Sequence, residues 1–324
     1  MMMAQTLFKL LKAQQPHSQI YVLAVAWTRA LLDAMPEVDG VIDMPIGHGP
    51  FALIERWRIG RSLRHYQFDQ AIVLPNSFKS ALIPYFAKIP LRTGWLGEIR
   101  YGLLNDHRKL HKPDYPLMVE RYAALAFPEH AKLPRLPFPE LQVDDKNQAQ
   151  LLERLSLNVN RPVLILCPGA EYGIAKRWPQ AYYAEVAQTF IERGYQVWSM
   201  GSKSDISVGD EIFTLLSVEA QLHFRNIAGT TQLSEALLIM QQAKMVLSND
   251  SGLMHIAAAL QKPLAVVFGS TSPDHTPPLG EQVAIIQEPI ECSPCFKREC
   301  PYGHYRCLKD LRPSAVLKAI DTLI

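Results

Sequence analysis

The sequence predicts an α/β protein built from two doubly wound domains, each with a parallel sheet covered by helices on both faces. Short apolar runs alternate with helix-length segments along most of the chain, as in parallel α/β sheets. This pattern stops in a proline-rich stretch, residues 127–141, and then restarts. A chain of 324 residues is also long for a single hydrophobic core. We therefore place an N-terminal domain at residues 1–145 and a C-terminal domain at residues 146–324.

In the first half, helix and strand signals alternate in chain order. The second helix is ended by Pro36, because proline cannot continue a helix. After the fourth strand comes a basic loop, residues 100–112. The predicted helices span residues 5–14, 27–35, 54–65, 78–86 and 117–126. The predicted strands span residues 20–25, 40–44, 70–74 and 92–94.

The second half repeats the alternation with more strongly apolar strands. Because parallel strands end at the same edge of a sheet, the loops that follow them form a ligand crevice. The predicted strands span residues 163–167, 196–200, 224–227, 244–248 and 264–268. The predicted helices span residues 180–193, 205–216, 233–242 and 313–324, with a further Ala-rich helix that begins near Gly252.

Composition excludes several classes of protein. The formal net charge is only +2, which argues against a general nucleic-acid binder. No apolar run approaches the roughly 20 residues that a membrane span needs. Lys9 and Lys12 interrupt the apolar positions at the N-terminus, so we expect no signal peptide there. These features favour a cytoplasmic location.

Four of the five cysteines are close together near the C-terminus. Cys167 stands alone in a strand-like run and is predicted to be a buried core thiol. The others are Cys292, Cys295, Cys300 and Cys307, with His304 between the last two. In a reducing compartment this spacing suggests a metal before a disulfide. The second pair is split, unlike a paired zinc ribbon, so we favour reduced thiols in a compact loop.

The segment from Ser248 to Leu260 carries the most chemical information. A buried strand meets a polar turn with Asp250, and an Ala-rich helix begins at once. Such a turn directs free backbone N–H groups and a helix dipole at one point, which suits a phosphate. Gly252 permits close approach to the backbone, and His255 lies about one turn further on. The alternative is an ordinary strand–turn–helix in which Asp250 or Ser251 caps the helix.

Three further loops follow strands of the C-terminal domain. Residues 167–179 contain Gly169 in a flexible loop that ends in Lys176-Arg177, two cations that could neutralise a diphosphate, and Trp178-Pro179 then starts a helix. The alternative is a solvated basic turn. Residues 201–205, which end in Asp205, suit contacts to a base or ribose, although this pattern is also a common turn and cap. Residues 268–278 follow the strand after the Asp250 turn and could rim a sugar pocket.

The first domain offers basic groups for an anionic acceptor. Residues 75–80 end one strand and begin a helix, and Arg92-Thr93-Gly94-Trp95 and the loop at 100–112 add positive charge and aromatic rings. A plain solvated surface is an equal alternative from charge alone. The acceptor-side candidates are Asn76, Lys79, Arg92 and Arg100.

Together these residues resemble the bacterial ADP-heptose:lipopolysaccharide heptosyltransferases, glycosyltransferases of family 9. Their GT-B architecture has two Rossmann-like domains that face a cleft. The resemblance covers nearly the whole chain to about Pro278, and the Cys-rich tail occurs in only some relatives. The segments that carry it are Asn249-Asp250-Ser251-Gly252-Leu253-Met254-His255, Pro168-Gly169-Ala170-Glu171-Tyr172-Gly173, Ala175-Lys176-Arg177-Trp178-Pro179, Leu74-Pro75-Asn76-Ser77-Phe78-Lys79-Ser80, Arg92-Thr93-Gly94-Trp95, Arg100-Tyr101-Gly102-Leu103-Leu104-Asn105 and Pro116-Leu117-Met118-Val119-Glu120-Arg121-Tyr122.

The resemblance implies inverting transfer of L-glycero-D-manno-heptose from its ADP derivative, with no essential metal or other cofactor. The implied acceptor is the first heptose of heptosyl-Kdo-lipid A, at the inner face of the cytoplasmic membrane. The enzyme would therefore be cytoplasmic and peripheral at that membrane. The donor-binding residues implied by matching are Gly169, Lys176, Asp205, Asp250, Ser251, Gly252 and His255. Among them, Lys176 would hold the diphosphate, Asp250 the sugar hydroxyls and Asp205 the nucleoside end.

The sequence departs from the family at its first residues. In relatives, the general-base Asp follows a first strand that would precede Met1 here, so we expect that base upstream of Met1. We also expect a first sheet without a central strand, and much higher activity once upstream residues are restored. Two alternatives follow: an inactive ADP-sugar-binding protein, or a heptosyltransferase for a different acceptor. A nucleotide-dependent oxidoreductase is disfavoured because no G-x-G-x-x-G fingerprint follows a strand.

Overall fold

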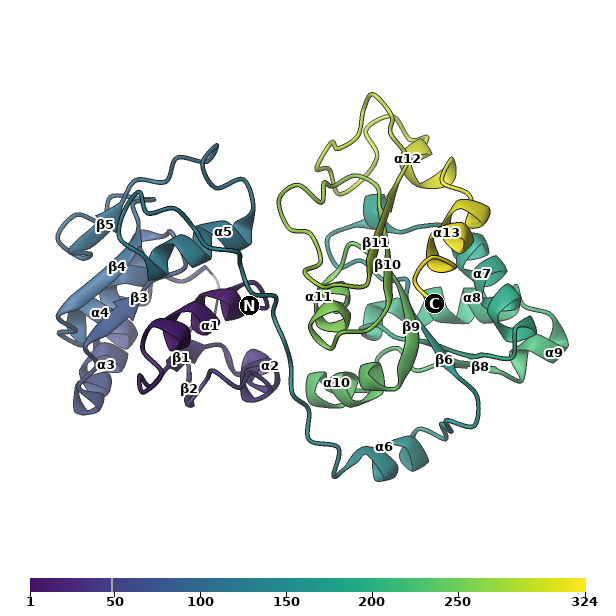
Figure 1. The fold of residues 1–324 in the computed structure, drawn as a ribbon, viewed down its shortest axis with the longest axis horizontal. Coiled ribbons are helices and arrows are strands. Elements are labelled where there is room, and N and C mark those ends of the chain that lie inside the picture. Colours follow the sequence, from purple (N-terminus) through teal and green to yellow (C-terminus); the bar gives the residue numbers. More distant parts are fainter. Residues whose placement is uncertain (48) are drawn as a thin grey trace. The chain divides into compact units, whose positions relative to one another are not determined.

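The computed structural model describes residues 1–47 and 49–324, which divide into two compact units (Figure 1). The first unit consists mainly of Met3–Asp33 and Glu37–Pro137, and the second mainly of Phe138–Ile324. The division after Pro137 falls within the proline-rich stretch, which forms no helix or strand between residues 127 and 141.

The first unit contains short helices and short parallel strands. Its α-helices are α1 (Ala4–Gln14), α2 (Arg29–Asp33), α3 (Leu53–Ser62), α4 (Leu82–Phe86) and α5 (Met118–Ala123). Its 3₁₀ turns are η1 (Ala26–Thr28), η2 (Leu63–Tyr66), η3 (Phe78–Ala81) and η4 (Ala124–Ala126). Its strands are β1 (Tyr21–Ala24), β2 (Gly40–Asp43), β3 (Gln70–Ile72), β4 (Leu91–Trp95) and β5 (Asp106–Arg108).

The strands of the first unit form two sheets instead of one. β1 pairs with β2 in parallel, and β3, β4 and β5 form a separate parallel sheet in that order. Among the described residues, β1 and β3 each have a single neighbouring strand. One apolar cluster nevertheless contains side chains from both sheets, including Leu23 of β1 and Ala71 of β3, packed around Leu63, Ile83 and Ile89.

The second unit is larger and more regular. Its α-helices are α6 (Gln148–Arg154), α7 (Gln180–Glu192), α8 (Ile206–Thr214), α9 (Val218–Gln221), α10 (Leu233–Gln241), α11 (Gly252–Ala259), α12 (Arg306–Lys309) and α13 (Pro313–Ile320). Its 3₁₀ turns are η5 (Ile174–Lys176) and η6 (Lys203–Asp205). Its strands are β6 (Val163–Cys167), β7 (Gln196–Ser199), β8 (Phe224–Asn226), β9 (Ala243–Asn249), β10 (Leu264–Phe268) and β11 (Val283–Gln287).

These six strands form one parallel sheet with the order β11-β10-β9-β6-β7-β8. The chain starts at β6, adds β7 and β8 on one side, and then crosses to add β9, β10 and β11 on the other. Helices α7, α8 and α13 pack together, whereas α10 and α11 lie across the sheet from them (Figure 1). The α/β fold class with parallel sheets is thus confirmed, and β6 and β9 flank the point where the strand order reverses.

The core of the second unit explains its strand sequences. Every residue of β6 and β10 is buried, as expected for parallel strands covered on both faces. Alternate residues such as Leu164 and Leu166 face a cluster built with α7, α8 and α13. Cys167 is 1% exposed at the end of β6, and burial raises the pKa of its thiol. The prediction that Cys167 is a core thiol is therefore confirmed.

Most predicted elements lie where the sequence places them, and the differences are local. The segment predicted as one helix at 78–86 begins as the 3₁₀ turn η3 and continues as α4. Residues 27–35 likewise form η1 followed by the short helix α2, and α13 ends at Ile320 instead of continuing to residue 324. Five short elements lie outside the predicted ones: β5, α6, α9, β11 and α12.

None of the described helices combines the length and the apolar character that crossing a bilayer would require.

Candidate functional site

Three loops of the second unit meet at one carboxylate, at the side of the six-stranded sheet where the strands end. β9 lies between β6 and β10, so the loops after these strands are neighbours. Asp250 follows β9 directly and is 8% exposed. Its Oδ2 atom accepts hydrogen bonds from Lys176 Nζ at 2.6 Å and from Thr271 Oγ1 at 2.6 Å. The structure thereby brings together the loops that the sequence predicts to carry diphosphate and sugar contacts.

The neighbouring Asn249 fixes the loop after β6. Its Oδ1 atom accepts from the backbone N–H of Trp178 at 3.1 Å and from the Tyr183 hydroxyl at 3.0 Å. Its Nδ2 atom donates to the carbonyl of Pro168 at 2.6 Å. Because Asn249 is fully buried, these bonds position the backbone on either side of the Lys176 loop.

The N-terminus of α11 has no side-chain cap. Ser251 occupies the cap position in an extended conformation, and its side chain makes no capping hydrogen bond. Asp250 is engaged by Lys176 and Thr271 instead, so the alternative in which either residue caps the helix is wrong. Apart from its chain neighbours and the nearby backbone of α11, a Cβ atom added at Gly252 would meet no described atom within 4 Å. The first N–H groups of α11 and the helix dipole are therefore available to an anion.

His255 lies in the next turn of α11 and is half-buried. Burial lowers the pKa of its imidazole to about 4, against the opposing influence of the Asp250 carboxylate. The side chain is therefore neutral near pH 7 and can accept or donate a hydrogen bond without adding charge.

The Lys176 loop is supported by the Cys-rich tail. Lys176 Nζ lies 5.0 Å from the centre of the Tyr172 ring, and the guanidinium of Arg298 lies 5.4 Å from the same centre. The Tyr172 hydroxyl donates to the carbonyl of Phe296 at 2.8 Å. A Cβ atom at Gly173 would lie 2.4 Å from the Arg298 carbonyl oxygen, so only glycine permits this contact. This contact between the tail and the Lys176 loop is not predicted from the sequence.

The four tail cysteines line one small cavity together with Ala175 and Ser270. All four are free thiols. Burial is the largest influence on Cys307 and, with the neighbouring thiols, raises its pKa to about 11. Burial also raises the pKa of Cys300, but four backbone N–H groups outweigh it and lower that pKa overall. Across residues 1–47 and 49–324, no three His, Cys, Asp or Glu side chains are arranged to hold a metal ion.

Asp205 is held inside the loop that follows β7. One oxygen of its carboxylate accepts from the backbone N–H of Ser202 at 2.9 Å and from the Ser202 hydroxyl at 2.8 Å. The other oxygen pairs with Arg177 at 3.4 Å. A Cβ atom at Gly169 would lie 2.3 Å from the Asp205 carboxyl carbon, so Gly169 provides the space for this side chain. Asp205 thus connects the loops after β6 and β7.

On the first unit, Asn76 and Lys79 lie on the loop and 3₁₀ turn that follow β3. Lys79 Nζ donates to the carbonyls of Gly49 at 2.8 Å and Pro50 at 3.4 Å. The Asn76 carbonyl accepts from the backbone N–H of Glu98 at 3.2 Å. Both side chains are at a surface loop that the sequence predicts to face the acceptor.

Arg92 and Arg100 are engaged by backbone groups of their own unit. Arg92 donates to the carbonyls of Leu103 and Ile89, each at 2.6 Å. Arg100 is fully buried and donates to the Pro75 carbonyl at 2.7 Å and also to the Trp95 carbonyl. Desolvation by burial lowers the pKa of Arg100. In this conformation both guanidinium groups hold loops together at the sequence-predicted acceptor side.

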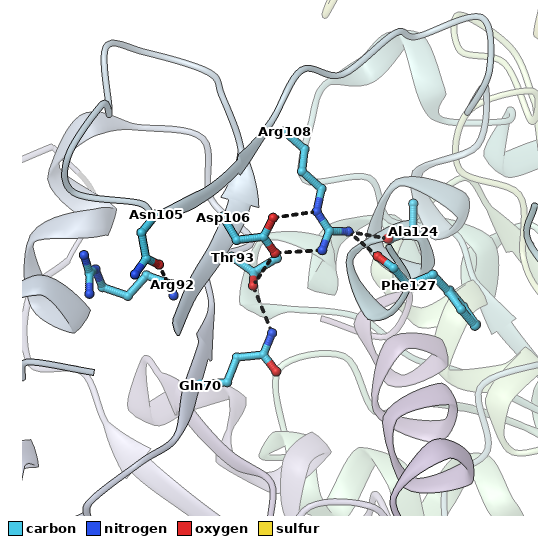
Figure 2. Close-up of polar contacts among 8 residues, drawn as sticks. All are labelled: Gln70, Arg92, Thr93, Asn105, Asp106, Arg108, Ala124 and Phe127. Carbon is cyan, nitrogen blue, oxygen red and sulfur yellow. Dashed lines mark hydrogen bonds and ion pairs between the residues drawn. The ribbon is translucent and has the colours of Figure 1, made fainter. Parts of the chain in front are cut away.

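A polar chain crosses the three-stranded sheet in the same region (Figure 2). Gln70 Nε2 donates to Thr93 Oγ1 at 2.9 Å, and Thr93 donates to Asp106 Oδ2 at 2.9 Å. Arg108 pairs with Asp106 at 2.7 Å and donates to the Ala124 carbonyl at 2.9 Å. Its side-chain hydrogen bond is the largest influence that lowers the pKa of Asp106. This series of hydrogen bonds joins the sheet to the end of α5 and to η4. No motif in the sequence predicts it.

Comparison with known proteins identifies the class to which this fold and site belong. Residues 56–306 match the model of glycosyltransferase family 9 (heptosyltransferase). The chain belongs to this family and is a transferase.

Individual relatives agree over the full length. The chain is 48% identical to lipopolysaccharide heptosyltransferase 2 of Salmonella typhimurium, over all of this chain and 95% of that protein. It is 47% identical to lipopolysaccharide heptosyltransferase 2 of Escherichia coli, again over all of this chain and 95% of that protein. The structure of E. coli ADP-heptose lps heptosyltransferase II superposes with a TM-score of 0.89 and 46% identity, covering 100% of this chain and 94% of that one.

Proposed function

We propose that this protein transfers L-glycero-D-manno-heptose from ADP-heptose to the first heptose of the lipopolysaccharide inner core, with inversion at the anomeric carbon. The observation that carries the proposal is full-length identity of nearly one half to lipopolysaccharide heptosyltransferases 2. The site supports it, because an ADP-sugar needs a fixed cation, a helix N-terminus and a carboxylate close together.

In this proposal the diphosphate binds between Lys176 and the N-terminus of α11. Lys176 supplies a point charge, and the uncapped N–H groups near Ser251 and Gly252 supply directed donors. The Asp250 carboxylate holds the Lys176 ammonium at 2.6 Å. The positive charge and the N–H groups are therefore in place before ADP-heptose binds, so little reorganisation is needed during the reaction.

The sugar and nucleoside occupy opposite sides of that diphosphate site. Asp250 accepts hydrogen bonds from heptose hydroxyls, with the neutral His255 nearby. The loops that contain Gly169 and Asp205 contact the nucleoside end. Because the Asp205 carboxylate is already bonded to Ser202 and Arg177, we assign it the positioning of these loops as well as a polar edge for the nucleoside.

Asn76 and Lys79 are the groups that we assign to direct contact with the anionic acceptor. We assign Arg92 and Arg100 an indirect role, because the guanidinium groups of these two residues hold the surrounding loops in place. Lys79 bonds only to backbone carbonyls in the described residues, so its charge is not neutralised by a carboxylate there. The acceptor is the heptosyl-Kdo-lipid A at the inner face of the cytoplasmic membrane, where the enzyme is peripheral.

The transfer is a single displacement in this account. The acceptor hydroxyl oxygen bonds to the anomeric carbon as the bond from that carbon to the β-phosphate oxygen breaks. The bonding electron pair leaves with ADP, and the hydroxyl proton passes to a base. Charge builds on the anomeric centre and the diphosphate together, and Lys176 with the α11 N–H groups stabilises the diphosphate as that charge develops.

The test measures ADP release by this protein with purified ADP-heptose. The acceptors are Kdo-lipid A carrying one heptose, the same lipid without heptose, and no acceptor. We expect ADP release that depends on the mono-heptosyl acceptor. Release that is fastest with the heptose-free lipid would assign a different acceptor, and donor binding without turnover would support a non-catalytic ADP-sugar-binding protein.

A further inference from the structure

Helix α3 of the first unit presents apolar side chains to solvent. Leu53, Ile54 and Trp57 are 46%, 61% and 41% exposed. Leu53 and Trp57 are four residues apart, and Ile54 is three before Trp57, so all three lie on one side of the helix. A surface helix normally turns such residues toward the core, so the opposite orientation has to have a structural cause.

The cause is on the other face of α3. A Cβ atom at Gly60 would lie 2.6 Å from Phe86 Cβ and 2.7 Å from the Ile83 carbonyl oxygen, so this close contact with α4 needs glycine. Arg56 is 4% exposed and donates to the carbonyl of Phe51 at 2.7 Å. Ile59 also packs against the apolar core of the unit. With this side of α3 fixed against the unit, Leu53, Ile54 and Trp57 face outward.

The exposed side of α3 is also cationic. Arg58 and Arg61 are both exposed, and the Arg61 guanidinium lies 5.4 Å from the centre of the Trp57 ring. Neither arginine forms an ion pair with any of the residues that the structure describes. We call Leu53, Ile54, Trp57, Arg58 and Arg61 the α3 surface.

The α3 surface is continuous with the loop assigned to the acceptor. Phe51 is 50% exposed, and its ring stacks on that of Phe78 with centres 6.4 Å apart. Phe78 begins the turn that carries Lys79, and Lys79 donates to the carbonyls of Gly49 and Pro50, just before Phe51. A molecule held by Lys79 would thus lie beside the α3 surface.

We propose that the α3 surface docks the enzyme on an anionic phospholipid bilayer, with Leu53, Ile54 and Trp57 in the headgroup region. The choice of a bilayer rests on the proposed function, whose acceptor is lipid-anchored. A helix with exposed Trp, Leu and Ile beside arginines fits such an interface, because the rings insert while the cations pair with lipid phosphates. A second copy fits less well, because Arg58 and Arg61 of each copy would face each other.

The first test uses co-sedimentation with vesicles of phosphatidylethanolamine and phosphatidylglycerol. The variant is Ile54→Ser with Trp57→Ser, and the matched control is Val218→Ser with Leu222→Ser, two residues of the second unit that are 75% and 70% exposed. We expect the first pair to lower the vesicle partition coefficient by about tenfold or more, since two apolar side chains no longer insert. The control should partition like the wild type. Equal partitioning of all three proteins would overturn the proposal.

The second test removes charge. Arg58→Gln with Arg61→Gln should weaken binding to anionic vesicles, whereas Arg161→Gln with Lys244→Gln, at two exposed positions of the second unit, should not. Wild-type binding that is equally strong on neutral phosphatidylcholine would contradict the electrostatic part of the proposal. Concentration-dependent dimerisation that the Ile54 and Trp57 changes abolish, without vesicle binding, would assign the surface to a second copy instead.

These tests separate the membrane proposal from the proposed function. Transfer to a lipid-free, mono-heptosyl oligosaccharide should be the same for the wild type and the α3 variants, because no α3 residue belongs to the site. If the wild type binds anionic vesicles but transfers no heptose, the proposed function fails and the docking surface remains. If transfer occurs but vesicles are not bound, the docking proposal fails alone.

Discussion

Lys176 and Asp250 form the centre of the candidate site through one short ion pair between two loops. Both side chains are largely buried, so the pair is protected from screening by salt. A buried pair of this kind is weak evidence for stability and better explained by a functional requirement. The ammonium is held where a diphosphate would reach it, and the carboxylate retains acceptor capacity for sugar hydroxyls.

Replacement of Lys176 tests the diphosphate assignment. We expect Lys176→Met to lower kcat/KM for ADP-heptose by about 10²-fold or more, because a fixed donor to the developing charge is lost. The matched control is Lys244→Met, because Lys244 is exposed and lies at the end of β9 far from Asp250. Steady-state ADP release measures both. Equal activity of the two variants would contradict the role of Lys176.

Replacement of Asp250 tests the sugar assignment. Asp250→Asn keeps the shape of the side chain but removes the charge that pairs with Lys176. We expect kcat/KM for ADP-heptose to fall by about 10²-fold and the affinity for ADP alone to fall by much less, because an amide oxygen at this position can still accept a hydrogen bond from Lys176. Calorimetric titration with ADP separates the two effects. A parallel loss of ADP affinity would move Asp250 from the sugar to the diphosphate.

At the scale of elements, the long and strongly patterned segments could be predicted from the sequence. β6 and β10 are continuous apolar runs, and each coincides with its predicted span. β5 was missed because its residues, Asp106-His107-Arg108, carry no apolar signal. Its place in the sheet depends on a hydrogen-bonded chain between distant residues, and no local pattern in the sequence encodes such a chain.

The candidate site could likewise be predicted from the sequence only in part. The sequence predicted that Lys176 and Asp250 would both lie at the ligand crevice, because their loops follow parallel strands. The adjacency of those strands, β6 and β9, is seen only in the structure. Thr271, which also binds Asp250, lies in a loop that was predicted only as a possible rim. The support from Phe296 and Arg298 was missed, because contacts between the tail and the Lys176 loop span more than a hundred residues. The backbone hydrogen bonds of Arg92 and the burial of Arg100 also depend on tertiary contacts.

The contact between the tail and the Lys176 loop leads to a prediction about Gly173. A side chain there would collide with the Arg298 carbonyl at 2.4 Å and push the two segments apart. We expect Gly173→Ala to weaken donor binding by about tenfold with little change in secondary structure, since the loop loses its positioning. The KM for ADP-heptose and circular dichroism measure this. Gly303→Ala, with positive φ but no neighbour within 4 Å, controls for backbone strain.

The polar chain across β3, β4 and β5 leads to a prediction about pH and stability. Hydrogen bonding by Arg108 holds the folded-state pKa of Asp106 below its ordinary value of about 3.9. The stabilisation is therefore fully present above that value and is lost as pH falls through the lower folded-state pKa. We expect Asp106→Asn to cost about 1–3 kcal/mol near pH 7 and progressively less below pH about 4. Urea unfolding of the wild type and of the variant at several pH values measures this cost. A cost that does not change with pH would contradict the account.

At the scale of the whole molecule, the second unit contains every residue assigned to the donor. Its continuous six-stranded sheet has its own core, so it meets the structural requirements for independent folding. We expect a fragment of residues 138–324 to fold and to bind ADP with an affinity within about tenfold of the full chain. Circular dichroism and calorimetry check this. A folded fragment that does not bind ADP would place part of the donor site in the first unit.

The two units also separate the two substrates in this account. The second carries the donor groups on a regular sheet, and the first carries the acceptor groups and the α3 surface on short strands in two sheets. Chemistry with a soluble nucleotide and contact with a lipid-anchored acceptor therefore rely on different parts of the chain.

Heptose transfer is measured most directly by mass spectrometry of the acceptor after incubation with this protein and ADP-heptose. We expect Kdo-lipid A carrying one heptose to gain the mass of a single heptosyl residue, and the heptose-free lipid to stay unchanged. Gain of heptose by the heptose-free lipid, or no gain by either lipid while ADP-heptose remains intact, would contradict this expectation.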